Sequence, residues 1–206
     1  MSTIYTKEKQ KLTINNDEYT KSPREWSNLG FFITIDREYN SPDNHPDFEE
    51  IIRETGEEAN DINDHMKMIK KEIKSRLGEK VLAIYPIAKY EHSGVLYSLG
   101  ERHGFDYSNN GFYIITEKNA KEIGTPKKSF EKVIKEELKY YNQWVNGEMY
   151  EYTLEEKEKD NICKCCGHNL GGEYKIIDSC GGFFDKEEIF SNINEKENNW
   201  NLIKED

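Results

Sequence analysis

Apolar residues recur at every third or fourth position over two long stretches of the chain. The first stretch covers residues 47–77 and the second covers residues 130–145, and a glycine follows each of them closely. Because this spacing places the apolar side chains on one side of an α-helix, both stretches are predicted to be amphipathic helices. Gly56 and Asn60 interrupt the first stretch, so its division into two helices stays open.

Short runs of aromatic and β-branched residues lie around these two stretches. Runs of this kind, bounded by glycine, proline and polar residues, predict strands. Pro86 lies within one run and indicates an edge position or a bulge, because proline has no N–H to donate to a neighbouring strand. The predicted strands are 11–14, 31–36, 81–90, 94–99, 111–116, 149–153 and 173–178, with short helices at 118–123 and 185–192.

The order of these elements does not follow the regular strand–helix alternation of a parallel sheet. We therefore expect an α+β fold in which a mixed, largely antiparallel sheet packs against two long amphipathic helices. The chain has 206 residues, which is long for one domain and short for two. We predict a single domain over residues 1–206, with a small zinc-stiffened subregion at 161–184.

The charge balance of the chain is strongly acidic. Forty Asp and Glu residues against 29 Lys and Arg residues give a formal net charge of −11. This balance argues against direct nucleic-acid binding and favours a basic partner protein, although negative charge also serves solubility. No apolar run approaches the roughly 18 residues that a membrane span needs, and the first residues lack the apolar stretch of a signal peptide. We expect an intracellular, cytoplasmic protein without membrane contact.

The four cysteines lie late in the chain, which suits metal binding or free thiols in a reducing compartment. Cys163 and Cys166 have the two-residue gap of a zinc knuckle. His168 and Cys180 complete the predicted set of four zinc ligands, with Cys165 as a substitute. In the alternative interpretation, which stays open, these residues are free thiols on a loop.

His92 and Cys180 are the candidates for catalysis. A Cys–His pair is the minimum for covalent chemistry, because the imidazole accepts the thiol proton. His92 follows the predicted strand at 81–90, where it can equally serve to end that strand. The sequence has no phosphate-binding glycine loop, nucleophile elbow or paired-histidine metalloprotease motif, so a non-enzymatic role is expected.

Acidic residues crowd the first half of the predicted helix at 47–77, with only Arg53 opposing them. The second half is basic, and acids early with bases late suit the helix dipole, which is a structural explanation. In the functional alternative, the acidic half spans about 25–30 Å, imitates a row of phosphates and occupies a basic groove of another protein. The acidic residues predicted to contact a partner are Asp47, Glu49, Glu50, Glu54, Glu57, Glu58, Asp61 and Asp64.

Aromatic residues gather near the end of the second long helix. Tyr141 and Trp144 are added to the predicted partner-binding residues, because Trp and Tyr are common anchors of protein interfaces. The competing interpretation places them in the core.

Five blocks of the sequence together resemble a family of accessory proteins found in phages and mobile elements. The blocks keep the order of that family and are residues 22–30 (SPREWSNLG), 85–94 (YPIAKYEHSG), 111–115 (GFYII), 141–150 (YNQWVNGEMY) and 178–183 (DSCGGF). The resemblance implies a fold and a phage context but no mechanism. This chain differs from the relatives at residues 36–39, where they carry a longer basic stretch, and at Gly181, where they often carry Trp.

These observations together predict a phage-encoded inhibitor of a host defence system, of the anti-CRISPR kind. It is expected to bind a nucleic-acid-handling host protein, in its basic nucleic-acid groove, through the acidic surface. A small enzyme or a nucleotide-sequestering protein that acts on a defence signal is the alternative that stays open.

Overall fold

The computed structural model describes residues 2–36, 40–159, 163–169 and 171–205. Its contacts group the chain into two compact units. The central unit is Ser22–Asn146, and the terminal unit combines Met1–Lys21 with Gly147–Asp206. The sequence analysis expected one domain over residues 1–206. No linker in the sequence marks this division. The terminal unit is built from two segments that lie before and after the central unit in the chain.

The α+β fold class is confirmed, and the sheets are antiparallel throughout. The described residues contain five α-helices: two within the predicted helix at 47–77, one at the predicted 130–145, and one at each of the predicted short helices 118–123 and 185–192. None of the helices in the described part of the chain is both long enough and apolar enough to span a membrane.

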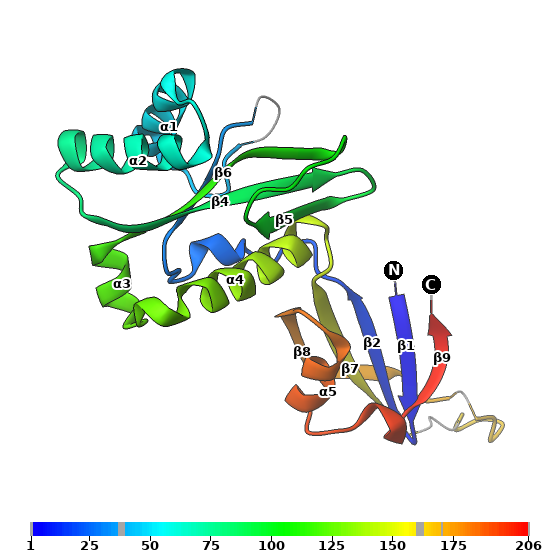
Figure 1. The fold of residues 1–206 in the computed structure, drawn as a ribbon. Helices are drawn as coiled ribbons and strands as arrows, with labels where there is room; N and C mark the ends of the chain where they lie inside the picture. Colours follow the sequence, from blue (N-terminus) through cyan, green and yellow to red (C-terminus); the bar gives the residue numbers. More distant parts are fainter. Residues whose placement is uncertain (1, 37–39, 160–162, 170, 206) are drawn as a thin grey trace. The chain divides into compact units, whose positions relative to one another are not determined.

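The central unit is built on a four-stranded sheet of order β3-β6-β4-β5. Its strands are β3 (Phe31–Thr34), β4 (Val81–Glu91), β5 (Val95–Leu99) and β6 (Tyr107–Thr116). The helical elements are η1 (Pro23–Glu25), α1 (Pro46–Glu58), α2 (Ile62–Glu72), η2 (Ile73–Leu77), α3 (Glu117–Ile123), η3 (Lys127–Ser129) and α4 (Phe130–Val145). Figure 1 shows α1 and α2 on one face of this sheet and α4 on the other.

Strand β6 explains why helices cover both faces of the central sheet. Its successive side chains point to opposite faces, and residues 111–116 are all buried. Tyr113 and Ile115 join the apolar cluster under α4, whereas Phe112 and Ile114 join the cluster under α1 and α2. A continuous apolar run of this kind needs a layer of helices on each side.

The predicted helix at 47–77 is divided, as Gly56 and Asn60 had left open. Helix α1 ends at Ala59, whose backbone is extended (φ −73°, ψ 139°). Helix α2 then starts afresh with Asp61 as its N-cap, since the Asp61 side chain accepts a hydrogen bond from the Asp64 N–H. The two helices pack against each other, and their apolar faces meet in one cluster.

The terminal unit is built on a five-stranded sheet of order β8-β7-β2-β1-β9. Its elements are β1 (Ser2–Lys7), β2 (Gln10–Asn16), β7 (Tyr150–Lys157), β8 (Tyr174–Phe183), α5 (Lys186–Asn192), η4 (Glu197–Asn199) and β9 (Asn201–Glu205). Ile189 and Phe190 of α5 pack against Leu12, Ile14 and Tyr152 of the sheet. Helix α5 therefore covers one face of this sheet (Figure 1).

The outer edge of the central sheet at β5 is closed by side chains of α4. The Asn142 amide accepts from the Tyr97 N–H (2.8 Å) and donates to the Tyr97 carbonyl (2.9 Å). One turn later, the Asn146 amide does the same with Val95, at 2.9 Å and 2.7 Å. These alternate residues of β5 thus have the amides of α4 in place of a further strand.

The two edge strands of the terminal sheet are each irregular. In β8, Ile176 pairs with Glu155 and Asp178 pairs with Leu154, so Ile177 is an extra residue. In β9, Ile203 is likewise skipped between the paired residues Leu202 and Lys204. Such bulges bend a strand and interrupt its hydrogen-bonding edge.

Candidate functional site

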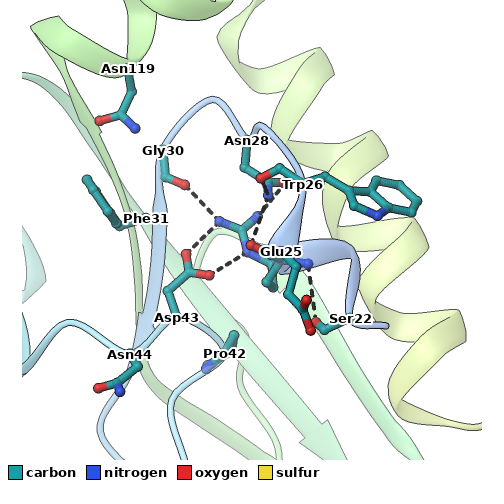
Figure 2. Close-up of a pocket in the computed structure, with 11 residues that line it drawn as sticks. Ser22, Glu25, Trp26, Asn28, Gly30, Phe31, Pro42, Asp43, Asn44 and Asn119 are labelled. Carbon is teal, nitrogen blue, oxygen red and sulfur yellow. Dashed lines mark hydrogen bonds and ion pairs between the residues drawn. The ribbon is translucent and has the colours of Figure 1, made fainter. Parts of the chain in front are cut away.

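Residues 22–30, the first block of the family resemblance, contain Arg24, which is the centre of a buried polar network. Its guanidinium donates to both carboxylate oxygens of Asp43 (2.9 and 2.6 Å) and to the Gly30 carbonyl (2.7 Å). It also donates to Asn28 Oδ1 (3.1 Å) and to Glu137 Oε2 (2.8 Å). Figure 2 shows Gly30, Asn28 and Asp43 arranged around this guanidinium. All five N–H groups of the arginine are therefore used within the protein.

The carboxylates of this network are also occupied by backbone groups. Asp43 accepts from the Phe32 N–H at 2.6 Å, and Glu137 accepts from the Leu29 N–H at 2.8 Å and from the Tyr113 hydroxyl. Burial and the charge of Glu137 raise the pKa of Tyr113, so its hydroxyl stays a donor at neutral pH. The network fastens residues 22–30 to the sheet and to α4, and it is structural.

Gly30 is required by this close packing. A Cβ atom at this position would lie 2.4 Å from the Ile114 carbonyl oxygen and 2.7 Å from Cε1 of Tyr113. The Gly30 N–H also donates to the Tyr113 hydroxyl at 2.9 Å. The glycine therefore allows the segment to approach β6 closely.

A surface depression of about 470 Å³ lies above this network (Figure 2). Its wall includes Trp26, which is 50% exposed and whose ring lies 6.3 Å from that of Tyr140. Its floor includes the side chain of Arg24, which has no donor left for a ligand. The guanidinium in this depression is therefore not available to fix a small ligand in place.

The predicted acidic surface is divided between two helices, α1 and α2, instead of lying along one long helix. Helix α1 has 13 residues, or about 20 Å of length, so the acids do not form one straight row of 25–30 Å. Asp61 caps α2, and Asp64 accepts from the backbone and side-chain amides of Asn60. These two acids therefore have local structural roles at the break between the helices.

Arg76, in the helical extension η2, lies beside the acidic face of α1. Its guanidinium is 2.6 Å from Glu54, 3.8 Å from Glu50 and 3.2 Å from Glu72. The basic end of the predicted helix thus folds back and offsets part of the acidic charge. The carboxylates of four acids of α1 make no hydrogen bond or ion pair with the residues that the structure describes: Asp47, Glu49, Glu57 and Glu58.

Tyr141 and Trp144 belong to the core side of α4. Tyr141 is only 7% exposed and packs with Phe32 and Tyr97, so it is not accessible to a partner. Trp144 is partly buried against the same cluster. Near the same helix, the exposed Trp26 ring contacts that of Tyr140, which like Trp144 is half-buried.

Three of the four cysteines come together between β7 and β8. The sulfur atoms of Cys163, Cys165 and Cys166 all lie within 4.8 Å of one another, close enough to hold a single metal ion. Cys163 accepts from the Cys165 thiol and from the backbone N–H groups of Cys165 and Cys166, which lowers its pKa to about 6. The substitute ligand Cys165 therefore joins the two knuckle cysteines in this group.

His168 and Cys180 are not members of this group in the described part of the chain. His168 follows the knuckle, and its carbonyl accepts from the Cys163 N–H at 2.8 Å. Cys180 lies on β8 opposite Tyr152, six residues and about 20 Å along the strand from Tyr174. The structure thus separates Cys180 from the cysteines with which it was predicted to bind zinc.

The glycine at position 181, near the end of β8, is explained by the side chain of Asp17. Asp17 accepts hydrogen bonds from Thr20, from the Tyr19 N–H (3.0 Å) and from the Gly182 N–H (2.9 Å). A Cβ atom at Gly181 would lie 2.4 Å from Oδ2 of Asp17. In this chain Asp17 thus fills the space into which a side chain at residue 181 would begin.

His92 lies at the β4–β5 turn of the central unit, where its side chain is 69% exposed and its Nδ1 is 3.9 Å from Asp106. Cys180 belongs to the terminal unit. The predicted Cys–His pair is therefore not formed within either unit.

Comparisons with known proteins supply no further constraint on the function. No family model, no curated protein and no solved structure matches this chain.

Proposed function

We propose that this chain is a non-catalytic, phage-encoded inhibitor of a bacterial defence system, which acts by binding a nucleic-acid-handling host protein. The contact surface is the exposed face of α1, and it occupies a basic groove that otherwise holds nucleic acid. The proposal rests on four carboxylates of α1 that form no ion pair with the described residues: Asp47, Glu49, Glu57 and Glu58.

The contrast with the other polar groups supports this surface. Arg24 binds both Asp43 and Glu137, Asp61 caps α2, and Asp64 accepts from Asn60. Helix α1 carries six acids and only one basic residue, so the unpaired group adds to a field that attracts a basic surface. Charge of this kind guides association and makes it sensitive to salt.

The test is capture of partners from a nuclease-treated bacterial lysate by the tagged chain and by two charge-reversed variants. The first variant carries Glu49→Lys, Glu57→Lys and Glu58→Lys on α1. The control carries Glu101→Lys, Glu122→Lys and Glu131→Lys, three exposed acids elsewhere in the central unit. The wild type and the control are expected to retain one nucleic-acid-binding protein, and the α1 variant to lose it.

The captured protein is then tested for competition with an oligonucleotide that it binds. An oligonucleotide is expected to displace the wild-type chain, with an apparent affinity that falls as salt rises. Retention by the α1 variant, or equal loss from both variants, would contradict the proposal.

We also propose that the ion held by Cys163, Cys165 and Cys166 is zinc, in a structural role. Thiolates are preferred zinc ligands, and the site stiffens the connection between β7 and β8. Metal analysis of the purified chain is expected to find one zinc per molecule. A chelator is expected to lower the melting temperature, and the C163S/C166S variant is expected to show no further loss.

A further inference from the structure

Strands β4, β5 and β6 carry a row of exposed apolar side chains at one end of the central sheet. Tyr90 of β4 pairs with Leu96 of β5 on one side and with Tyr107 of β6 on the other. Residues directly opposite each other on neighbouring strands share a face of the sheet, so the three side chains lie side by side. The rings of Tyr90 and Tyr107 are 5.1 Å apart, and Leu96 and Tyr107 are 50% and 36% exposed. These three residues are called the apolar row below.

The apolar row lies on the face of the sheet that α1 and α2 cover. Side chains alternate along β4, and Tyr90 is six residues from Ile84, which packs against the cluster under these helices. Tyr107 reaches the same face because β6 has an extra residue between positions 108 and 111. Six residues of strand span about 20 Å, and the β4–β5 turn lies at the end of the sheet away from α1 and α2 (Figure 1). The row is therefore exposed on the same side of the central sheet as α1.

The acidic face of α1 supplies charge to a partner but little apolar area. The large apolar side chains of this helix, Phe48, Ile51 and Ile52, are all buried. Ion pairs at an exposed surface contribute little to affinity, because water and salt screen them. Stable interfaces are anchored by a few aromatic and apolar side chains that become buried on binding. A partner held by α1 therefore needs an apolar anchor elsewhere in the central unit.

The charges on this side of the sheet define the chemistry of the surface that covers the row. The four unpaired carboxylates of α1 attract a basic surface. The face of a tyrosine ring is also negative and attracts the guanidinium of arginine. Tyr90 and Tyr107 thus suit arginine side chains, and Leu96 between the strands suits an aliphatic one.

We infer that the apolar row of Tyr90, Leu96 and Tyr107 anchors the partner contact, and that it binds the apolar and arginine side chains of a basic protein surface. The inference rests on the proposed function, because α1 supplies the charge that selects this partner. It deepens that proposal by naming a second contact surface and the side chains that the surface takes.

The test is NMR titration of the isotope-labelled full-length chain with three short peptides. The first peptide alternates arginine with leucine, the second arginine with serine, and the third glutamate with leucine. The arginine–leucine peptide is expected to shift the amide resonances of the apolar row and of α1. The arginine–serine peptide is expected to shift those of α1 alone, and the glutamate–leucine peptide neither set.

A pair of matched variants gives the contribution of the row to affinity. Leu96→Ser is expected to weaken binding of the arginine–leucine peptide by roughly tenfold, the effect of truncating an anchor residue. The control is Leu202→Ser on β9, a leucine that is 53% exposed in the terminal unit. It should keep the wild-type affinity, and melting curves of both variants check that each is folded.

The inference would be overturned if the arginine–leucine peptide left the row unshifted, or if the glutamate–leucine peptide bound the row equally well. Equal weakening by Leu96→Ser and Leu202→Ser would overturn it too. Failure of the proposed function gives a different result. In that case the arginine–serine peptide leaves α1 unshifted, while the arginine–leucine peptide still reports on the row by itself.

Discussion

The two units protect the edge strands of their sheets from pairing with another chain in different ways. In the central unit, the amides of Asn142 and Asn146 bind the backbone of β5 directly. In the terminal unit, the edge strands β8 and β9 each contain an extra residue that disturbs the pairing edge. A row of unpaired N–H and C=O groups invites pairing with another chain, and both devices reduce that risk.

The difference teaches that edge protection can be carried by side chains or by the backbone. The asparagines lie four residues apart on α4, which matches alternate residues of the strand that they cover. The bulges need no particular side chain, and they leave Ile177 and Ile203 exposed at 48% and 63%. The central unit is therefore expected to depend on individual polar residues more strongly than the terminal unit does.

The largest expected effect comes from the polar network of the central unit. Arg24→Met leaves Asp43 and Glu137 without their cation, and breaking a buried ion pair of this kind costs about 3–5 kcal/mol. Chemical denaturation should show this loss in the central unit, whereas Arg53→Met on the exposed face of α1 should leave the stability unchanged. A loss below about 1 kcal/mol would show that the network does not hold residues 22–30 in place.

A smaller loss is expected when the asparagine pair is removed. Asn142→Ala with Asn146→Ala deletes four hydrogen bonds to β5. Such bonds contribute roughly 0.5–1.5 kcal/mol each, and the two bonds of Asn146 are exposed, so the expected cost lies in the lower part of the summed range, at about 2–4 kcal/mol.

The amides of Val95 and Tyr97 should then exchange faster with solvent, and the variant should self-associate at high concentration. The control is Lys135→Ala, an exposed residue of the same helix. Unchanged exchange at Val95 and Tyr97 would mean that the asparagines do not protect the edge.

In the terminal unit, the corresponding polar group is Asp17. Burial raises the pKa of this carboxyl, but hydrogen bonds from Thr20, Tyr19 and Gly182 outweigh burial and lower the pKa below its ordinary value. The carboxylate therefore contributes stability above the unfolded pKa of about 3.9 and loses it as pH falls through the lower folded pKa.

The expected contribution of Asp17 is about 1 kcal/mol at neutral pH. Asp17→Asn should remove it, and the gap between variant and wild type should close as pH falls below about 4. Melting curves at several pH values give this comparison. A gap that stays constant with pH would exclude the charge of Asp17 as its source.

The smallest effect is expected at the bulges. Ile177→Lys and Ile203→Lys change exposed side chains and should alter stability by no more than about 0.5 kcal/mol. Light scattering of the wild type and both variants should show equal or lower association for the variants. A large loss of stability would mean that these side chains pack as part of the fold.

The sequence predicted those parts of the fold that depend on local pattern. The run at 111–115 is a buried strand because both of its faces are covered, and residues 130–145 form α4 within the predicted limits. The break after Glu58 was left open, because it depends on the extended backbone of Ala59 and the cap at Asp61.

The local pattern of apolar and polar residues could not predict which distant strands pair. Strands β1 and β2 pair with β9 and β7, which are more than a hundred residues away, and nothing local announces that choice. The same holds for the candidate site. The two-residue gap marked Cys163 and Cys166, but Cys165 joined them because of how the turn folds. Arg24 meets Glu137 across 113 residues, so its structural role is invisible in a single sequence.

The pairing of β2 with β7 makes the central unit an insertion into the terminal one. Asn16 lies opposite Tyr150, and the Asp17 N–H donates to the Met149 carbonyl at 2.8 Å, so residues 22–146 occupy the place of a hairpin loop. On the ribosome, all residues of the central unit emerge before β7, β8 and β9. Strands β1 and β2 therefore lack their partners β9 and β7 until the whole central unit has been synthesised.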